Sequence, residues 1–577
     1  MIKKLLGSVR EYKRESILAP LTVAAEVVLE VLIPRLMANL IDNGIDVGNM
    51  NYIIKIGLVL VGACAFALVL GALSGHFAAC AAAGFSKNLR KDMYYAVQDF
   101  SFSNIDRFST ASLVTRLTTD VTNLQNSYQM IIRVAVRSPL MLLFSMIMVF
   151  SVNRRMSLIF LCVVPVLAIG LYFIMSGAHP IFTRVFKTYD TLNTVVQENL
   201  RGIRVVKTYV REDHEIKKFG EVSNTIYKDF SKAEGLVAFN MPLMQASVYT
   251  CLLLISWVGA RLIVGGSMTT GDLVSIISYA MQILMALMFF SMTIVMITIS
   301  RASAQRIVEV LEERSDIVNP EHPIYEVRDG SIDFRGVSFN YAKEARENCL
   351  RDIELHIKGG ETVGIIGGTG AGKTTLVQLI PRLYDVTLGA VCVGGADVRQ
   401  YDIETLRDAV AMVLQKNELF SGTIKENLRW GNPNATDAEM EHACRLAQAD
   451  GFIKAFPDGY DTYVEQGGTN VSGGQRQRLC IARALLKKPK ILIFDDSTSA
   501  VDTATDAAIR QALLHEIPDT TKIIIAQRVL SVQDADMIVV LDNGRINAVG
   551  THAQLLAGNT IYQEVYHSQM KGGDFDA

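Results

Sequence analysis

Six long apolar segments in the first 300 residues constrain this chain more than any other feature. They cover residues 17–41, 56–75, 138–153, 156–178, 235–260 and 273–300, and only the first contains charged side chains. Most of them reach or exceed the roughly 20 residues that a helix needs to cross the hydrocarbon core of a bilayer. The third is short, but apolar sequence extends it backward to Met130, interrupted by Arg133 and Arg137. The sequence therefore predicts six membrane-spanning helices.

Two long loops between these segments indicate which way the chain faces. Residues 86–129 and 179–234 are polar, rich in Lys and Arg and helical in periodicity, and the N-terminus is also basic. Basic loops of this kind stay on the cytoplasmic side of a membrane. We expect each loop to form helices that leave the membrane, turn and return. A small docking element is expected at each turn, near residues 104–117 and 208–219.

The first apolar segment carries two carboxylates, Glu26 and Glu30, whose spacing places them on one face of a helix. Charged groups inside a membrane are costly and mark candidate functional sites, so proton coupling or cation binding is one interpretation. The alternative is structural, with the pair bonded to neighbouring helices or to Arg35. The sequence leaves both interpretations open.

The second half of the chain has a different character. Half of all residues are hydrophobic, yet 20% are charged, which is typical of a chain that is part membrane-spanning and part soluble. Helical sequence continues over residues 301–315, and Pro320 and Pro323 mark a linker. We predict an all-α transmembrane domain over residues 1–320 and an α/β domain over residues 325–577.

Short β-rich runs alternate with helical stretches in the predicted second domain. The runs cover residues 331–334, 362–366, 491–494, 522–526 and 537–541. This alternation predicts an α/β domain with a largely parallel core sheet. Lys plus Arg numbers 56 against 58 for Asp plus Glu, so no excess of positive charge favours a nucleic-acid partner.

A glycine-rich loop follows one of these runs and precedes a helical stretch. It reads Gly367, Gly368, Thr369, Gly370, Ala371, Gly372, Lys373 and Thr374, which fits GxxxxGK[ST] in the context that this motif requires. The glycines let the backbone wrap around phosphates, so that successive N–H groups face the anion. Lys373 would reach the β- and γ-phosphates, and the Thr374 hydroxyl would bind Mg²⁺.

A second motif is the apolar run over residues 491–494, which ends in Asp495. A nucleoside triphosphatase places the carboxylate that holds Mg²⁺ at such a position. Many buried strands end in Asp, so this motif is weak alone and strong beside the glycine-rich loop.

Between the two motifs lie Ser472, Gly473, Gly474 and Gln475. With this signature the chain resembles one half of an ATP-binding cassette (ABC) exporter, six membrane helices fused to one nucleotide-binding domain, and the resemblance covers essentially the whole chain. It implies that ATP is bound by Tyr341, which stacks on adenine, by the glycine-rich loop with Thr375, and by the signature. It also implies that Gln415 touches Mg²⁺ together with Thr374 and Asp495.

Two positions depart from the family pattern. The family usually has Glu after the metal-binding Asp, as the general base for the attacking water, whereas this chain has Asp496. Where the family usually has a His that senses the γ-phosphate, this chain has Gln527. Aspartate is one methylene shorter, and glutamine cannot become cationic or move a proton near neutral pH. Together these changes at the catalytic positions predict a site that binds ATP and hydrolyses it poorly.

The family geometry gives this pattern a meaning. Two cassettes close head to tail, and each ATP lies between one chain's phosphate loop and the other's signature. An intact signature beside altered catalytic residues resembles the degenerate-site subunit of a bacterial heterodimeric multidrug-type exporter. The alternatives are a homodimer with two slow sites and an ATP-gated regulatory or channel-like subunit.

The resemblance also implies partners and a location. The expected partners are a second half-transporter, membrane lipids and a hydrophobic or amphipathic substrate, which could be a small molecule, a lipid or a peptide. Length and the lack of a transit peptide favour a bacterial plasma membrane, with the nucleotide-binding domain in the cytoplasm. The sequence does not identify the substrate, because a fold does not fix what is transported.

Overall fold

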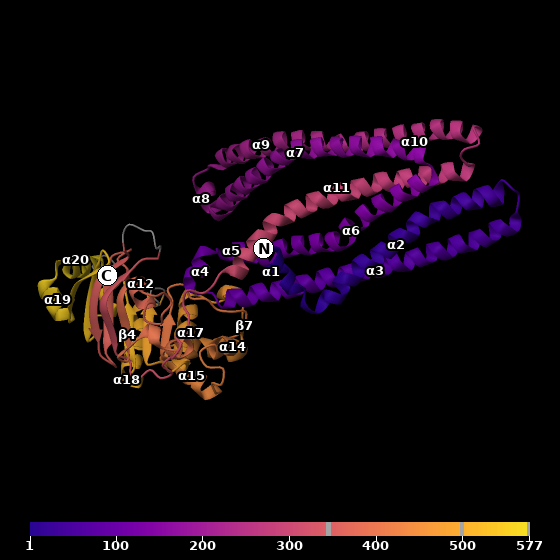
Figure 1. The fold of residues 1–577 in the computed structure, drawn as a ribbon. Coiled ribbons are helices and arrows are strands. Elements are labelled where there is room, and N and C mark those ends of the chain that lie inside the picture. The colour runs from indigo at the N-terminus through magenta and orange to yellow at the C-terminus, as the bar shows by residue number, and fades with distance from the viewer. Residues whose placement is uncertain (342–347, 497–500, 574–577) are drawn as a thin grey trace. The chain divides into compact units, whose positions relative to one another are not determined.

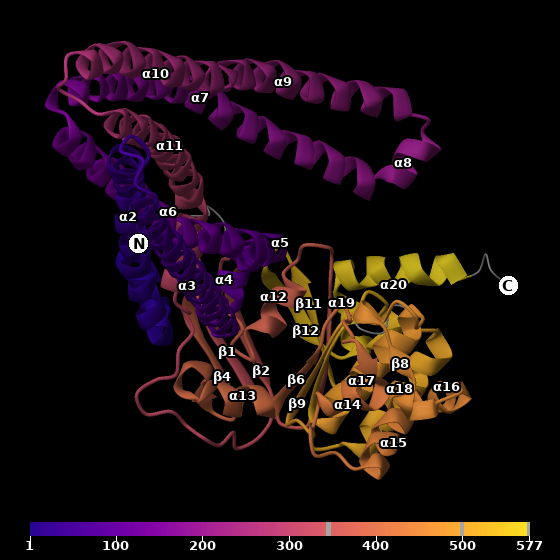
Figure 2. The same ribbon diagram turned by 90° about the vertical axis from the view of Figure 1, so that its right-hand side faces the viewer.

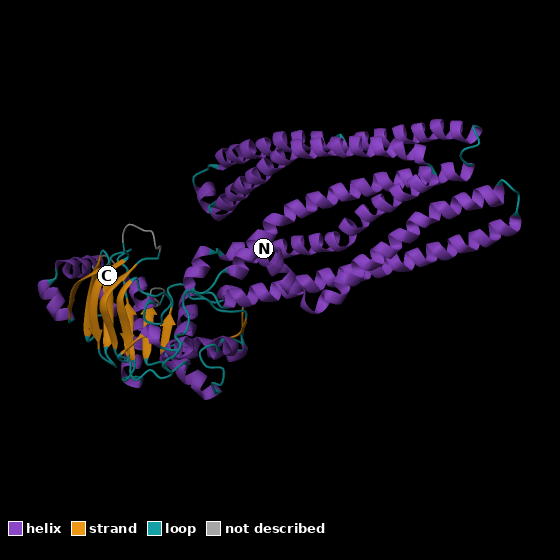
Figure 3. Ribbon diagram, viewed as in Figure 1, coloured by secondary structure: helices purple, strands orange, loops and turns teal. Residues whose placement is uncertain are grey.

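The computed structural model describes residues 1–341, 348–496 and 501–573, which belong to two compact units. The first unit combines Met1–Gln98 with Thr110–Glu313, and the second combines Asp99–Ser109 with Arg314–Ala577. The first unit is helical, and the described strands belong to the second (Figure 1, Figure 3).

The first unit is built from helices that range from 5 to 49 residues. Their bounds are α1 Ile2–Leu6, α2 Lys13–Leu40, α3 Met50–Gln98, α5 Thr110–Thr115, α6 Val121–Val152, α7 Arg154–Arg201, α8 Ile203–Thr208, α9 Glu212–Ala238, α10 Asn240–Val264 and α11 Thr270–Glu312. Among the described residues, six helical stretches are long and apolar enough to cross a membrane. The prediction of six spans is thereby confirmed. Helices α2, α3 and α6 pack side by side, as do α7, α9 and α10 (Figure 1, Figure 2).

Polar side chains set where these helices begin. The Asn153 side chain accepts hydrogen bonds from the backbone N–H groups of Arg155 and Met156 and so starts α7. Thr269 and Asp272 form a capping box that starts α11. Both caps lie in short connections between spans, so these turns are encoded locally.

A proline inside α2 ties this helix to α11. Pro34 has no N–H group, which leaves the carbonyl of Glu30, four residues earlier, without a donor from its own helix. Gln282 of α11 donates to that carbonyl at 3.3 Å. Tyr279 of the same helix donates to the carbonyl of Val31 at 2.9 Å. A backbone acceptor inside a membrane needs such a partner, because lipid offers none.

The two expected docking elements differ in accuracy. Short helices α4 Phe102–Arg107 and α5 lie at the first turn, within or next to the predicted range. The second prediction, residues 208–219, was wrong by several residues, because the turn helix is α8, Ile203–Thr208. Three acidic residues, Glu212, Asp213 and Glu215, lie in the first turn of α9 and favour a helix start there.

The second unit contains two main sheets. The six-stranded sheet has the order β12 Arg545–Gly550, β11 Met537–Asp542, β3 Thr362–Gly367, β10 Thr521–Ile525, β9 Ile491–Asp495 and β6 Val410–Val413, parallel except for β12. The largely parallel core sheet is thus confirmed. The four-stranded sheet has the order β2 Leu350–Ile357, β1 Ile332–Phe339, β4 Leu388–Val393 and β5 Ala396–Asp397 and is antiparallel. A pair, β7 Gly422–Thr423 and β8 Tyr463–Val464, stands apart.

Besides α4, the second unit contains helices, several of which pack against the parallel sheet. They are α12 Lys373–Gln378, α13 Ile403–Ala409, α14 Ile424–Arg429, α15 Asp437–Leu446, α16 Asp450–Ala455, α17 Gly473–Leu486, α18 Thr503–Glu516, α19 His552–Gly558 and α20 Thr560–Gly573. Alternate residues of β9 enter two different cores, Ile491 and Ile493 on one face and Leu492 and Phe494 on the other. Burial on both faces explains why this strand is a continuous apolar run.

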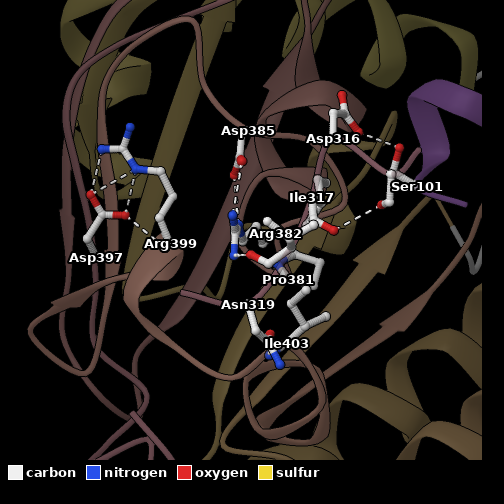
Figure 4. Close-up of polar contacts among 12 residues, drawn as sticks. Ser101, Asp316, Ile317, Asn319, Pro381, Arg382, Asp385, Asp397, Arg399 and Ile403 are labelled. Carbon is white, nitrogen blue, oxygen red and sulfur yellow. Dashed lines mark hydrogen bonds and ion pairs between the residues drawn. The ribbon is translucent and has the colours of Figure 1, made fainter. Parts of the chain in front are cut away.

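Within the second unit, polar contacts join helix α4 to the linker after residue 313 and join this linker to the rest of the unit (Figure 4). The Ser101 hydroxyl, which caps α4, donates to Asp316 of the linker at 2.5 Å. Arg382 is buried, donates to both oxygens of Asp385, and also donates to the carbonyl of Val318 at 3.2 Å. The linker is therefore an ordered part of this unit.

Candidate functional site

The glycine-rich loop lies between β3 and α12, and its backbone needs glycine at specific positions. Gly370 and Gly372 have φ angles of +83° and +95°, a region that side-chain-bearing residues rarely adopt. A Cβ atom on Gly367 would lie 2.2 Å from the carbonyl oxygen of Leu541 on β11. The loop is therefore packed tightly against the sheet, as a phosphate-binding loop requires.

Lys373 begins α12 and points back over this loop. Its Nζ donates to the carbonyl oxygens of Gly367 and Gly368 at 2.8 and 2.9 Å. Burial lowers the pKa of this ammonium, while Asp496 and Asp495 act in the opposite direction. A cation beside the glycine-rich loop at the start of a helix suits the charge of a triphosphate.

Thr374 and Asp495 form the pair expected to hold a metal ion. The Thr374 hydroxyl donates to Oδ1 of Asp495 at 2.9 Å. Asp495 is only 2% exposed, and burial raises its pKa, with a further increase from the charge of Asp496. Two adjacent carboxylates beside a hydroxyl are the hard oxygen ligands that Mg²⁺ prefers, and a divalent cation would relieve their repulsion. These residues fit the metal.

Asp496 lies at the catalytic position and is held by two amides. Its Oδ2 accepts from Nε2 of Gln527 at 2.6 Å and from Nε2 of Gln415 at 3.4 Å. Its backbone has φ +49°, and its N–H donates to the carbonyl of Ile525 at 3.1 Å, which continues the pairing of β9 with β10. The three residues expected to be catalytic thus form one hydrogen-bonded group. It lies next to Thr374 and Asp495, the pair expected to hold the metal ion.

Tyr341 follows β1, a strand of the antiparallel sheet, and contacts helix α12 after the glycine-rich loop. Its hydroxyl lies 3.0 Å from the Thr375 hydroxyl and donates to Gln378 at 3.2 Å. Burial raises the pKa of this phenol, yet the residue is 47% exposed. A ring fixed at its hydroxyl end and open on the other side can stack on a base.

The signature residues lie apart from this group. Ser472 caps α17 and forms a capping box with Gln475, while Gly473 and Gly474 make the first turn of the helix. In the part of the chain that the structure describes, no hydrogen bond joins these four residues to the glycine-rich loop. Ser472 and Gly473 are exposed. Their functional groups face outward from this chain.

Two residues near the site carry no motif in the sequence. Gln569 of α20 donates to the carbonyl of Gln527 at 2.7 Å and accepts from the N–H of Val529 at 2.8 Å. Tyr384 packs edge-on against the Tyr341 ring, and its hydroxyl donates to Asp106 of α4 at 2.6 Å. Glutamine and tyrosine make such bonds anywhere in a protein, so no sequence signal pointed to either.

Fold and site together define an ATP-binding membrane transporter subunit, and comparisons with known proteins agree. A family model described as the ABC transporter transmembrane region matches residues 16–287, and one described as ABC transporter matches residues 350–499. The chain is 38% identical over 568 residues to the ABC transporter ATP-binding protein YfiB of Bacillus subtilis, covering 98% of each chain.

Two further relatives extend this result. An ABC transporter ATP-binding protein of Mycobacterium tuberculosis is 36% identical over 574 residues, covering 99% of this chain and 98% of that protein. The ABC transporter ATP-binding protein YknU of Bacillus subtilis is 34% identical over 484 residues, or 84% and 83% of the two chains. The chain belongs to the ABC transporter family and has the exporter-type architecture, a helical membrane domain followed by a nucleotide-binding domain.

Proposed function

We propose that this chain is one subunit of an ATP-driven exporter in a bacterial plasma membrane. Its own site binds ATP with Mg²⁺ and hydrolyses it slowly, and its signature completes the catalytic site of a second half-transporter. The observation that carries the proposal is the 2.6 Å hydrogen bond from Gln527 to Asp496.

That hydrogen bond bears on catalysis because it orients the carboxylate of Asp496. Oδ2 of Asp496 accepts from both Gln527 and Gln415, which favours one position of the side chain. A general base must reach the attacking water, and the side chain here is a methylene shorter than that of glutamate. A displacement of about 1 Å can reduce a rate by on the order of a hundredfold. Gln527 donates a hydrogen bond but has no proton to exchange near neutral pH.

The binding half of the site has the groups that it needs. Lys373 and the loop glycines can hold the phosphates, Thr374 with Asp495 can hold Mg²⁺, and Tyr341 offers a ring for adenine. When bound, Mg²⁺ neutralises charge on the phosphates and the two aspartates. The contrast between a suitable binding half and an impaired catalytic half favours a degenerate site over a weak but ordinary one.

The signature suggests a role outside this chain. Ser472 is exposed at the start of α17, and its side chain is already oriented by Gln475. Such a helix start can offer N–H groups to an ATP held by another chain. A partner with glutamate and histidine at the two altered positions would gain most from it. The substrate, a hydrophobic or amphipathic compound, would bind in the membrane domain.

The test is ATP hydrolysis by the purified chain in lipid nanodiscs, with binding of a fluorescent ATP analogue measured in parallel. We expect binding without significant turnover. Lys373→Ala is the control that loses binding. Robust turnover by the unmodified chain would contradict the proposal and indicate a homodimer in which Asp496 acts as the base.

A complementation experiment tests the signature separately. A chain with Asp496→Glu and Gln527→His has a repaired site, and the further change Ser472→Arg removes its signature. This triple variant should be inactive alone. Adding the unmodified chain should restore hydrolysis, because its signature then faces the repaired site. Failure to restore hydrolysis, when the repaired chain with an intact signature is active, would contradict the role given to the signature.

A further inference from the structure

Three charged side chains meet inside the membrane-spanning helices of the first unit. Arg137 of α6 donates to Oε1 of Glu26 at 2.6 Å and to both oxygens of Glu30 at 2.7 Å, and both glutamates belong to α2. We call Glu26, Glu30 and Arg137 the charged cluster. It joins two helices that pack against each other and against α3.

The cluster lies within the thickness of a bilayer. At 1.5 Å per residue, Glu30 and Glu26 are about 15 and 21 Å from Leu40, the end of α2, and Arg137 is about 22 Å from Val152, the end of α6. The hydrocarbon core of a membrane is about 30 Å thick. Charges at this depth are costly unless they are paired or functional.

The charges in the cluster do not balance. Two carboxylates share one guanidinium, which leaves one negative charge in excess. Arg133, one turn before Arg137, lies against α3, where its guanidinium is 3.7 Å from the position that a Cβ on Gly75 would occupy. In the described part of the chain Arg133 has no ion pair with either glutamate. Its positive charge partly offsets the excess negative charge from a distance. The hydrogen bonds within the charged cluster do not involve it.

Two buried polar atoms, one on α2 and one on α3, lack a hydrogen-bond partner in the described part of the chain. One is Oε2 of Glu26, whose side chain is 9% exposed. The other is the hydroxyl oxygen of Ser74 on α3, a residue that is fully buried. A buried polar group left unsatisfied is costly, and most are found with a partner. Ser74 lies one helical turn from Gly71, a residue of α3 that is close to the Glu26 carboxylate.

Gly71 leaves room beside the unpartnered carboxylate oxygen. A Cβ at this position would lie 3.0 Å from Oε1 and 3.6 Å from Oε2 of Glu26. On the other side, the Glu30 and Arg137 side chains are 28% and 31% exposed. The cluster therefore has a buried end with one unsatisfied oxygen, Oε2 of Glu26, and a partly exposed end at Glu30 and Arg137.

A second ion pair on α2 shows what a structural pair looks like in this protein. Arg35 donates to Asp272 of α11 at 2.8 Å, one cation against one carboxylate. Its charges balance, and neither side chain has a buried atom without a partner in the described part of the chain. The charged cluster differs in both respects.

We infer that the charged cluster is a binding site for the positive charge of a lipophilic organic cation dissolved in the membrane. The cation would face Glu30 at the accessible end and supply the charge that the cluster lacks, while its apolar groups remain among the helices. This inference rests on the proposed function only for its consequence, that such a cation is a transported substrate. The site itself requires neither ATP turnover nor a partner chain.

The experiment compares two probes of similar size and opposite charge, tetraphenylphosphonium and tetraphenylborate, bound to the purified chain in detergent. We expect the cation to bind more tightly than the anion. Glu26→Gln and Glu30→Gln each remove one negative charge and should weaken cation binding at least tenfold without weakening anion binding. The matched control Asp272→Asn alters the balanced pair and should leave cation binding unchanged.

Each outcome decides the inference. Equal cation affinity in the unmodified chain and both glutamine variants would overturn it. An equal loss for both probes in variants that keep the melting temperature of the unmodified chain would also overturn it, because binding would then not depend on the charge of the probe. Since the assay contains no nucleotide, charge-selective binding by a chain that fails to export even together with a second half-transporter would contradict the proposed function and leave the site intact. Export of the cation unaffected by either variant would reject the site alone.

Discussion

Two regions of this protein each bring two carboxylates and one cation together in a buried place. In the nucleotide site, Asp495 and Asp496 lie beside Lys373, while in the membrane Glu26 and Glu30 share Arg137. The difference is in the hydrogen bonds. Neutral donors hold the aspartates, and Lys373 donates to loop carbonyls, whereas Arg137 donates directly to both glutamates.

This difference shows how similar charges serve different purposes. Aspartates that accept hydrogen bonds from neutral groups keep their negative charge for a metal ion bound to the phosphates. Glutamates bridged by an arginine keep their geometry when no ligand is present and retain one unbalanced charge.

The largest effect is expected from removing the bridging cation. Arg137→Gln leaves two carboxylates at membrane depth without a partner and should destabilise the chain by about 3 kcal/mol. We expect a melting temperature lower by several degrees in a thermal-shift assay in detergent. The triple variant in which Glu26, Glu30 and Arg137 all become Gln removes every charge and should recover most of the loss. If it is as unstable as Arg137→Gln, packing rather than charge holds these helices.

The second prediction concerns catalysis in the nucleotide site. Asp496→Glu with Gln527→His should raise the hydrolysis rate by about tenfold to a hundredfold. The base at position 496 regains the length of glutamate, and a histidine at position 527 can hold a proton. Single-turnover hydrolysis with ATP bound to saturation measures this step. Either single change should give less than the pair. No gain from the double variant would show that these two positions do not limit the rate.

The two regions also differ in how far the sequence predicted them. The glycine-rich loop and Thr374 lie close together in the chain, and their contacts follow from a local motif. Arg137 is 107 and 111 residues from its two glutamates, and the sequence offered Arg35 as an alternative partner. Which face of each helix meets its neighbour depends on packing and tilt, which apolar segments do not encode.

The same distinction holds in the second unit. Four of the five parallel strands, β3, β9, β10 and β11, were predicted because each is a largely apolar run that is buried on both faces. The parallel strand β6, with four residues, was not predicted. The antiparallel strands β2 and β4 were also not predicted, because buried and exposed residues alternate in β2 and the first two residues of β4 are exposed. Gln569 contributes through two bonds to the backbone near Gln527, 42 and 40 residues away, and its residue type carries no signal.

A third prediction follows from the raised pKa of Asp495. Because folding raises this pKa, the protonated form is favoured in the folded chain, and ionisation as the pH rises above the ordinary value of about 3.9 lowers the free energy of unfolding. Without nucleotide at pH 7, Asp495→Asn should therefore raise the free energy of unfolding by about 1 kcal/mol.

Thermal shift at several pH values measures this effect. The advantage of Asp495→Asn should shrink as the pH falls toward 4, where the unmodified carboxyl takes up a proton. Adding Mg²⁺ and ATP should reverse the order, because only the unmodified chain gains the stabilisation of a bound metal. An advantage that does not change with pH would contradict the electrostatic explanation.

The smallest effect is expected at the edge of the nucleotide site, where Gln569 holds the backbone around Gln527. Gln569→Ala removes one bond to the carbonyl of Gln527 and one from the N–H of Val529, each worth about 1 kcal/mol at most. Hydrogen–deuterium exchange at the Val529 amide should accelerate by up to about tenfold, since its acceptor is lost.

Gln563→Ala is the matched control, because Gln563, also on α20, donates at 2.7 Å to a carbonyl of α19, at Leu556. If both variants accelerate exchange at Val529 equally, α20 acts by packing alone. If only Gln569→Ala does, the side chain of Gln569 positions Gln527. The hydrogen bond that Gln527 donates to Asp496 then depends on α20.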